Sequence, residues 1–288
     1  MNDAEGYTLI DAGNGRKLEQ FGPVLIDRPC AQAVWAPTLP PSAWEQADAS
    51  FTRDEGNAWS FRRPIAETWR VRLNGLLFEL RCTDFGHVGL FPEHVLAWRW
   101  LARHRDELHA APPDTVRLLN LFAYSGGATL AAARLGFSVC HLDASRKMVA
   151  WGSRNAELNG LQDAPIRWIV DDVKKFLKRE IRRGAAYDGI FMDPPSFGRG
   201  KRQELFKIDK DLLDLLALCR GVLAPKPWFV FLSCHTPGYT PLVLEHLLRQ
   251  GFDGLGGHTE TGEMVLEGGA GVLPVPSGTY AVWSANVT

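Results

Sequence analysis

The stretch that decides the fold runs from Val116 to Asp143 and reads VRLLNLFAYSGGATLAAARLGFSVCHLD. Its first part, Val116–Leu121, is an apolar run of strand length, and the alanine-rich segment Ala128–Leu135 is typical of a helix. Gly126 and Gly127 lie between the two, where glycine permits a sharp turn and lets a ligand approach the backbone closely. The pattern predicts a strand, a tight glycine turn and a helix.

The next strand is expected over Phe137–Leu142, with Asp143 at its end. An acidic residue about 20 residues after a glycine turn is typical of a site that holds a ribose through its hydroxyl groups. The glycines match neither the dinucleotide fingerprint nor the phosphate-binding loop. A nucleoside ligand without a phosphate chain remains, and S-adenosylmethionine (SAM) fits that description. The alternative is an ordinary packing turn between strand and helix.

Composition excludes several classes of protein. The chain has 288 residues and a formal net charge of −1, so only local patches could attract nucleic acid. Its five cysteines are scattered, which argues against a disulfide framework or a metal site and for a reducing compartment. No bilayer-spanning run or secretory leader is visible, so we expect a cytoplasmic protein with no membrane partner. Homo-oligomerisation is compatible with the sequence.

Residues 1–85 are predicted to form a small β-rich N-terminal domain. Turn signals at Gly13-Asn14-Gly15 and at Asn74-Gly75 each separate β-like runs and predict two hairpins. This part is also rich in tryptophan. Buried packing is one interpretation of these rings, and a platform on which bases stack is the other: Trp35, Trp44, Trp59 and Trp69.

Residues 86–288 are predicted to form a second domain in which strands and helices alternate, as in a parallel sheet covered on both faces. A helix from about Glu93 to Arg105, with Pro92 in its first turn, opens this domain. The segment Phe91–Glu93 is interpreted either as a lid over the cofactor or as the start of a helix that joins the domains.

Carboxylates follow two further strands, where they would face the ligand crevice of an open α/β sheet. Asp171 and Asp172 come after Ile166–Val170, and either one could accept a hydrogen bond from adenine or cap the following helix. Asp193 comes after Tyr187–Met192 and begins the sequence DPPSF, whose two prolines predict a stiff loop.

Basic residues occur in two places beside these carboxylates. The loop after DPPSF carries Arg199, Lys201 and Arg202 and is expected to be flexible. It suits phosphate binding, and a solvated surface loop is the alternative. The helix expected over Val173–Arg183 is rich in lysine and arginine, which indicates a solvated face or a contact with an RNA backbone.

Taken together, these strand-end motifs resemble class I SAM-dependent methyltransferases. More narrowly, the chain resembles bacterial 23S ribosomal RNA methyltransferases of the cytosine-C5 and guanine-N2 types. The resemblance covers about residues 85–283 and rests on the segments NLFAYSGGATLAAARLG, VCHLDASRKMVAWGSRNAELNGL, DDVKKFLKRE and YDGIFMDPPSF. It implies a Rossmann-like, mostly parallel sheet of seven strands, SAM as cofactor, and RNA, ribosomal RNA first, as substrate. Two departures are an N-terminal part unlike the PUA domain of many relatives and GLFPEH in the lid segment.

The resemblance also implies roles for single residues. Four residues of the glycine turn would line the methionine part of SAM: Phe122, Ala123, Ser125 and Gly126. Asp143 would hold the ribose, and Asp172, with Asp171 as the alternate, would meet the adenine amine. Phe91 would close over the cofactor, and Asp193 would sit beside the reacting base.

The reaction predicted first is methylation of cytosine at carbon-5. That carbon is a weak nucleophile, so a cysteine thiolate must first add to carbon-6 of the ring. Cys234 follows the strand expected over Trp228–Leu232, at the position where cytosine-modifying relatives carry a strand-end Ser-Cys. Asp193 would then form a hydrogen bond with the ring at N3, where charge builds up. The alternative for Cys234 is a small buried hydrophobic residue.

Two other functions stay open. An amino-nitrogen methyltransferase acting on guanine or adenine needs no cysteine. In it, Asp193 with the carbonyls of Pro194 and Pro195 would orient the amine, and Phe197 would stack on a flipped base. A SAM-binding, non-catalytic RNA-associated factor is the third hypothesis.

Overall fold

The computed structural model describes residues 6–53, 56–105, 116–199 and 205–285. The chain divides into two compact units. The first comprises Met1–Val95 with Val265–Ser277, and the second comprises Leu96–Met264 with Gly278–Thr288. The division therefore falls after the predicted boundary at residues 85–86, and it gives the first unit a C-terminal segment that the sequence does not predict.

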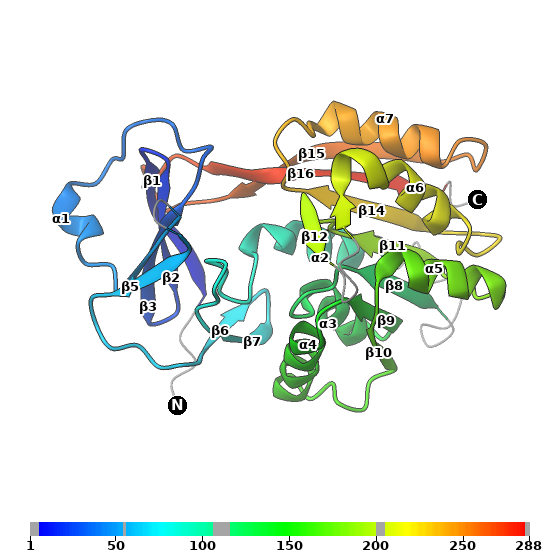
Figure 1. Ribbon diagram of the computed structural model, residues 1–288, viewed down its shortest axis with the longest axis horizontal. Coiled ribbons are helices and arrows are strands. Elements are labelled where there is room, and N and C mark those ends of the chain that lie inside the picture. The colour runs from blue at the N-terminus through cyan, green and yellow to red at the C-terminus, as the bar shows by residue number, and fades with distance from the viewer. Residues whose placement is uncertain (1–5, 54–55, 106–115, 200–204, 286–288) are drawn as a thin grey trace. The chain divides into compact units, whose positions relative to one another are not determined.

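The first unit contains a five-stranded sheet with the strand order β1-β2-β3-β4-β5 (Figure 1). Neighbours are antiparallel except β3 and β4, which pair in parallel. The short helix α1 (Pro41–Trp44) lies between β3 and β4 in the chain. The strands are β1 (Tyr7–Gly13), β2 (Arg16–Phe21), β3 (Val24–Pro29), β4 (Ala49–Thr52) and β5 (Ala58–Phe61).

Both predicted hairpins are confirmed. Asn14 and Gly15 connect β1 to β2 with φ angles of 51° and 76°. Asn74 and Gly75 connect β6 (Trp69–Leu73) to β7 (Leu76–Leu80) with φ angles of 48° and 77°. Two successive left-handed residues match the right-handed twist of the strands, which explains the Asn-Gly sequence at both turns.

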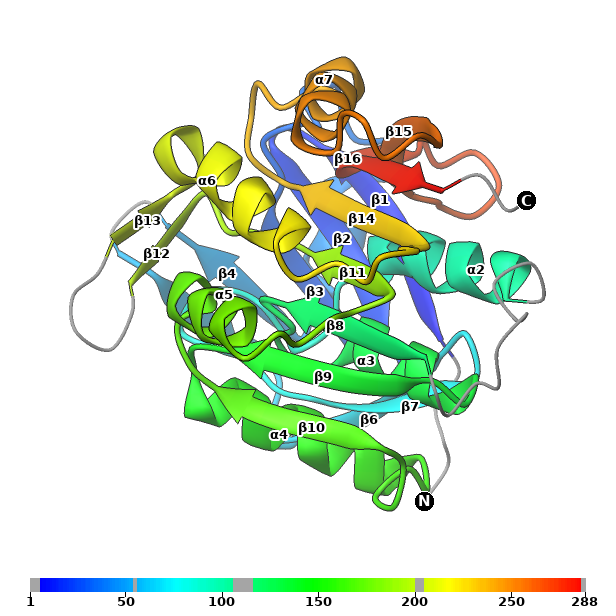
Figure 2. The same cartoon turned by 90° about the vertical axis from the view of Figure 1, so that its right-hand side faces the viewer.

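A seven-stranded sheet forms the centre of the second unit, with the order β10-β9-β8-β11-β14-β16-β15 (Figure 2). The strands from β10 to β14 pair in parallel, and β16 is antiparallel to β14. This confirms the predicted α/β fold with a mostly parallel sheet. The strands are β8 (Arg117–Leu121), β9 (Ser138–Asp143), β10 (Ile166–Val170), β11 (Gly189–Met192), β14 (Phe229–Cys234), β15 (His258–Leu266) and β16 (Val275–Ser284).

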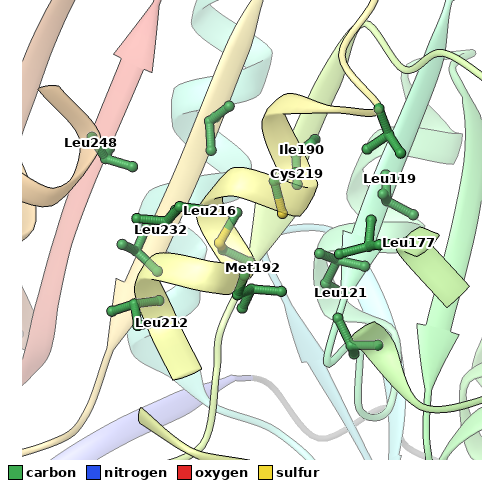
Figure 3. Close-up of a cluster of buried hydrophobic side chains, with 14 of the residues drawn as sticks. Leu119, Leu121, Leu177, Ile190, Met192, Leu212, Leu216, Cys219, Leu232 and Leu248 are labelled. Atoms are coloured by element: carbon green, nitrogen blue, oxygen red, sulfur yellow. The ribbon is translucent and has the colours of Figure 1, made fainter. Parts of the chain in front are cut away.

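Helices cover both faces of this sheet. Helices α2, α3 and α4 lie on one face and α5, α6 and α7 on the other (Figure 2). Alternation along β14 shows the division: the rings of Phe229 and Phe231 contact Trp100 of α2, whereas Leu232 packs with α5–α7 (Figure 3). The helices are α2 (Val95–His104), α3 (Gly127–Arg134), α4 (Arg146–Leu158), α5 (Val173–Arg182), α6 (Ile208–Arg220) and α7 (Pro241–Gly251), with the 3-10 helix η1 (Pro92–His94) before them. Among the helices of the described residues, none has both the length and the hydropathy that a bilayer crossing requires.

Candidate active site

The strand order of the second unit reverses between β8 and β11. Strands β9 and β10 follow on one side of β8, and β11 and β14 follow on the other. In open α/β sheets, ligands bind at such a reversal, outside the carboxyl ends of the strands. The loops that start at Phe122 and at Asp193 therefore flank the expected crevice.

The loop after β8 has an unusual backbone. Phe122 and Tyr124 have φ angles of 57° and 49°, and Gly126 has a φ of 96°. Left-handed backbone is costly for non-glycine residues and persists only where the surroundings enforce it. The Ala123 N–H donates to the Leu142 carbonyl at 3.0 Å, which ties this glycine turn to β9. The turn is therefore a rigid loop at the end of a strand.

A buried row of hydrogen-bonded polar side chains joins β8, α3 and β9 next to the glycine turn. Asn120 Nδ2 donates to Thr129 Oγ1 at 2.9 Å, and Thr129 Oγ1 lies 2.9 Å from His141 Nδ1. Burial lowers the pKa of His141 to about 3, so its ring is neutral at physiological pH. A Cβ on Gly152 would lie 2.9 Å from the Trp168 ring and 3.1 Å from the His141 ring, so a larger residue there would displace these side chains. Sequence analysis missed this row, because it joins three separate elements.

Asp143 closes the glycine turn at the end of β9. Its two carboxylate oxygens accept the N–H groups of Tyr124 at 3.0 Å and Ser145 at 2.8 Å. Burial raises the pKa of Asp143, and these two backbone bonds oppose the shift. A carboxylate has about four acceptor positions, so two remain for a ribose diol. The position of Asp143 and its remaining acceptor capacity therefore fit the ribose hydroxyls of SAM, and the ribose contact stays a prediction.

The two aspartates after β10 occupy different environments. Asp172 is the N-cap of α5 and accepts the N–H of Lys175 at 3.0 Å. Asp171 accepts the N–H of Asp172 at 2.8 Å and forms an ion pair with Arg179. The capping role considered from the sequence thus belongs to Asp172. The adenine contact stays a prediction for both residues.

Asp193 lies at the end of β11 beside the end of β14. Met192 pairs with Leu232, so Asp193 is level with Ser233, and Ser233 Oγ donates to Asp193 Oδ1 at 2.8 Å. His235 Nε2 lies 3.6 Å from the same oxygen. Sequence analysis missed Ser233. The signal was present, because side chains alternate along a strand and only one of Ser233 and Cys234 can face Asp193.

Cys234 points the other way. Its side chain is 1% exposed and belongs to the hydrophobic core that β14 forms with α5–α7. Burial raises the pKa of the Cys234 thiol, partly opposed by hydrogen bonds from Thr236. A protonated, buried thiol is a poor nucleophile. The nucleophilic role stays a prediction, and this environment weighs against it.

The loop after Asp193 leads into a short strand. Pro194 is buried, Pro195 is exposed, and Phe197 is 49% exposed in β12 (Phe197–Arg199). Strand β12 pairs antiparallel with β13 (Leu205–Lys207), so Gly198 and Arg199 do not belong to a flexible loop as predicted. The ring of Phe206 in β13 lies 5.5 Å from that of Phe122. Two residues predicted to bind the substrate, Lys201 and Arg202, lie outside the described residues.

Phe91 lies in the first unit, directly before η1. Its ring contacts those of His87 and His94, with centroids 5.0 and 6.0 Å apart. The role of Phe91 as a lid over the cofactor stays a prediction.

Comparison with known proteins agrees with this geometry. A family model described as S-adenosylmethionine-dependent methyltransferase matches residues 15–236. A SAM-dependent methyltransferase from Agrobacterium tumefaciens has a crystal structure that is 40% identical, with a TM-score of 0.89 over 99% of this chain and 91% of that one. SMU.776, a putative methyltransferase complexed with SAH, is 18% identical with a TM-score of 0.72 over 98% of this chain and 76% of that one, which shows the shared fold.

Curated relatives match a shorter part of the chain. The ribosomal RNA large subunit methyltransferase K/L of Pseudoalteromonas translucida is 31% identical over 54% of this chain. Its counterpart from Shewanella baltica is 34% identical over the same share. This chain spans only 21% of the length of either relative. The family model and the Agrobacterium structure, however, cover most of the chain, which therefore belongs to the family of SAM-dependent methyltransferases.

Proposed function

We propose that the protein methylates an exocyclic amino group of a purine in RNA, with guanine in ribosomal RNA as the first candidate. The observation that carries this proposal is the difference between two strand ends. Asp193 is partly exposed and hydrogen-bonded by Ser233, whereas Cys234 is buried in the core. Methylation of an amino nitrogen needs a protein group that accepts hydrogen bonds from the amine and orients it, and it needs no cysteine. This edge of the sheet offers such a group in Asp193.

The hydrogen-bond donors of guanine suit a carboxylate. The Watson–Crick edge of guanine presents N1–H and the N2 amino group as neighbouring donors, and an ionised carboxylate only accepts hydrogen bonds. Adenine presents one donor group beside an acceptor, which makes it a poorer match for Asp193. Holding the amine through its hydrogens would direct the nitrogen lone pair at the methyl group that SAM supplies. The exposed ring of Phe197 offers a surface on which the base can stack.

An RNA substrate is supported by the names of the curated relatives, which are ribosomal RNA methyltransferases. A structural neighbour, the Thermus thermophilus 16S rRNA N2 G1207 methyltransferase, was crystallised with AdoMet and guanosine. Its 18% identity and TM-score of 0.50 support a shared fold alone, so it does not decide the base.

Cytosine-C5 methylation is the second candidate, because Cys234, the last residue of β14, could supply the thiol that this reaction requires. It would need β14 to shift so that the thiol leaves the core and loses its proton. The buried environment of Cys234 makes this the less favoured reaction.

One experiment separates the candidates. The protein is incubated with labelled SAM and unmodified ribosomal RNA, the RNA is digested, and the methylated nucleoside is identified. We expect N2-methylguanosine from the wild-type protein and from Cys234→Ala, and at least about 100-fold slower formation of it by Asp193→Ala. N6-methyladenosine would keep the amino-nitrogen reaction but contradict guanine. 5-Methylcytidine that disappears in Cys234→Ala would contradict the proposal, and no labelled RNA at all would contradict an RNA substrate.

A further inference from the structure

Two large aromatic side chains of the first unit, on β5 and on a turn that contacts the same aromatic cluster, are exposed. Phe61 in β5 is 54% exposed, and Phe85 in a neighbouring turn is 68% exposed. Trp59, two residues before Phe61 on the same strand, is half-buried. Strand β5 lies at the edge of its sheet (Figure 1). Single exposed apolar residues are common, but a group of rings at one sheet edge indicates a binding surface.

The rings on β5 are held in place by packing and by a hydrogen bond. Trp59 packs on the buried ring of Phe51, with centroids 5.0 Å apart. The indole N–H of Trp59 donates to the Thr83 carbonyl at 2.7 Å. Phe61 stacks on Trp59 with an interplanar angle of 22° and a centroid distance of 6.4 Å. The exposed ring of Phe61 is therefore held in place by a stack that ends in the core.

Phe85 is displayed by a closed turn. The Gly86 N–H donates to the Thr83 carbonyl and the Thr83 N–H donates to the His87 carbonyl, both at 3.0 Å. Gly86 has a φ of 79°, and a Cβ on it would come within 2.5 Å of the Phe51 ring. The turn therefore rests directly on the same aromatic stack. Exposure of Phe85 follows from this fixed geometry.

Arginines lie at the end of β5. Arg62 and Arg63 are both exposed. Arg62 donates one bond to the Trp44 carbonyl at 2.9 Å, and Arg63 donates to Gln46 Oε1 at 2.7 Å and lies 3.6 Å from Asp48. A guanidinium has five N–H donors, so these contacts orient each fork and engage only part of it.

We propose that this β5 aromatic surface, made of Trp59, Phe61, Phe85, Arg62 and Arg63, binds unpaired nucleotides of the RNA substrate. The proposal rests on the proposed function, because it assumes that the substrate is RNA. Bases would stack on the exposed rings of Phe61 and Phe85, and phosphates would meet the two guanidinium groups. Asp84, exposed beside Phe85, places the phosphates at the arginine end.

The chemistry of the surface favours single strands over other partners. Bases inside a duplex are stacked on each other and cannot reach a protein ring, whereas unpaired bases stack on aromatic side chains. Arginine forks complement phosphates. A second copy of the chain pairing with the β5 edge is the competing occupant, and it would bring like charges together.

The test uses the full chain and two oligoribonucleotide probes of the same sequence, one single-stranded and one as a duplex. Fluorescence anisotropy gives the dissociation constants as a function of salt. We expect Phe61→Ala and Phe85→Ala each to weaken single-strand binding by about tenfold. The double change Arg62→Ala/Arg63→Ala should reduce the log–log salt slope by about 1.4. SAM affinity should not change.

Three controls make the result decisive. Val34→Ala removes an exposed apolar side chain of the same unit, 82% exposed, and should have no effect. Phe61→Trp keeps a ring and should restore binding. Thermal unfolding and sedimentation report whether the variants alter the fold or the oligomeric state.

Several outcomes would overturn the proposal. Equal single-strand affinity of wild type and all variants would do so. Variants that lower the unfolding temperature or change the oligomeric state, yet bind RNA as tightly as the wild type, would do so as well. These failures are distinct from failure of the proposed function. If the wild type methylates RNA while the variants bind it normally, only the β5 aromatic surface is wrong. If the wild type methylates no RNA, the proposed function is wrong.

Discussion

The ends of β11 and β14 are neighbours in one sheet, but their polar side chains lie in opposite environments. After β11, Asp193 is partly exposed and accepts the hydroxyl of Ser233. At the end of β14, Cys234 turns into the core and is 1% exposed. The two residues were expected to act together. Side-chain alternation along β14 gives the position facing Asp193 to Ser233 instead.

This difference determines what the edge can offer a substrate. The hydroxyl of Ser233 donates to Asp193 and orients its partly exposed carboxylate. Burial disfavours a thiolate at Cys234, whose pKa is raised. The same edge thus offers an acceptor for an amine and withholds a nucleophile.

The largest effect is expected from Asp193→Ala. Loss of the carboxylate leaves the acceptor amine without its orienting partner, and misplacement of a reacting group can cost about 100-fold in rate. We expect kcat for RNA methylation to fall by at least about 100-fold while SAM affinity is kept. Asp193→Asn retains one acceptor oxygen and should lose less.

The measurement is single-turnover transfer of labelled methyl groups to RNA. Asp163→Ala removes an exposed carboxylate from the segment before β10 and should behave as the wild type. An Asp193→Ala protein with normal turnover would place the acceptor elsewhere and remove the contrast between the two strand ends.

A smaller effect is expected at the end of β9. Asp143→Ala removes a carboxylate that would bond the ribose, and each hydrogen bond to a charged group is worth roughly 1.5–3 kcal/mol. SAM should therefore bind at least about tenfold more weakly by calorimetric titration. Because Asp143 also accepts the N–H groups of Tyr124 and Ser145, circular dichroism must show that the fold persists. An unchanged dissociation constant would mean that the ribose lies elsewhere.

The elements that the sequence predicts correctly are those whose conformation depends on neighbouring residues in the chain. The turns at Asn14-Gly15 and Asn74-Gly75 follow from the conformations that those residues adopt easily, and both hairpins are present. The glycine turn before α3 and the acids at the strand ends follow from strand–helix alternation in the same way. The predicted sheet is observed for this reason.

The parts that the sequence does not predict depend on contacts between distant segments. The bond between Ser233 and Asp193 requires the register of β11 against β14, which pairs Met192 with Leu232. The parallel pairing of β3 with β4 likewise joins separate segments, so β4 was not expected. The glycine- and arginine-rich sequence after Phe197 is typical of a flexible loop, although pairing with β13 places Gly198 and Arg199 in a strand.

The third prediction concerns Ser233→Ala. The change removes one hydrogen bond to Asp193 and leaves the carboxylate itself, so the effect should lie between those of Asp193→Ala and Cys234→Ala. We expect kcat to fall by about fivefold with SAM affinity unchanged. Ser233→Thr keeps a hydroxyl and serves as the conservative control. If kcat were unaltered, Ser233 would be a packing residue, and the orientation of Asp193 would depend on other neighbours.

The smallest effect is expected from Cys234→Ala, although this change discriminates best between the two reactions. In an amino-nitrogen methyltransferase the thiol only packs, so activity should stay within about twofold of wild type, with a modest loss of stability. Because burial raises its pKa, the Cys234 thiol should stay protonated at neutral pH and react slowly with iodoacetamide in the native protein. Cys219→Ala is the matched control, since Cys219 is also fully buried, in α6.

RNA carrying 5-fluorocytosine supplies the opposing test. If the protein became covalently linked to that RNA through Cys234, and if Cys234→Ala abolished both the link and methylation, β14 would have to expose its thiol during the reaction. The contrast between the two strand ends would then describe only the resting enzyme.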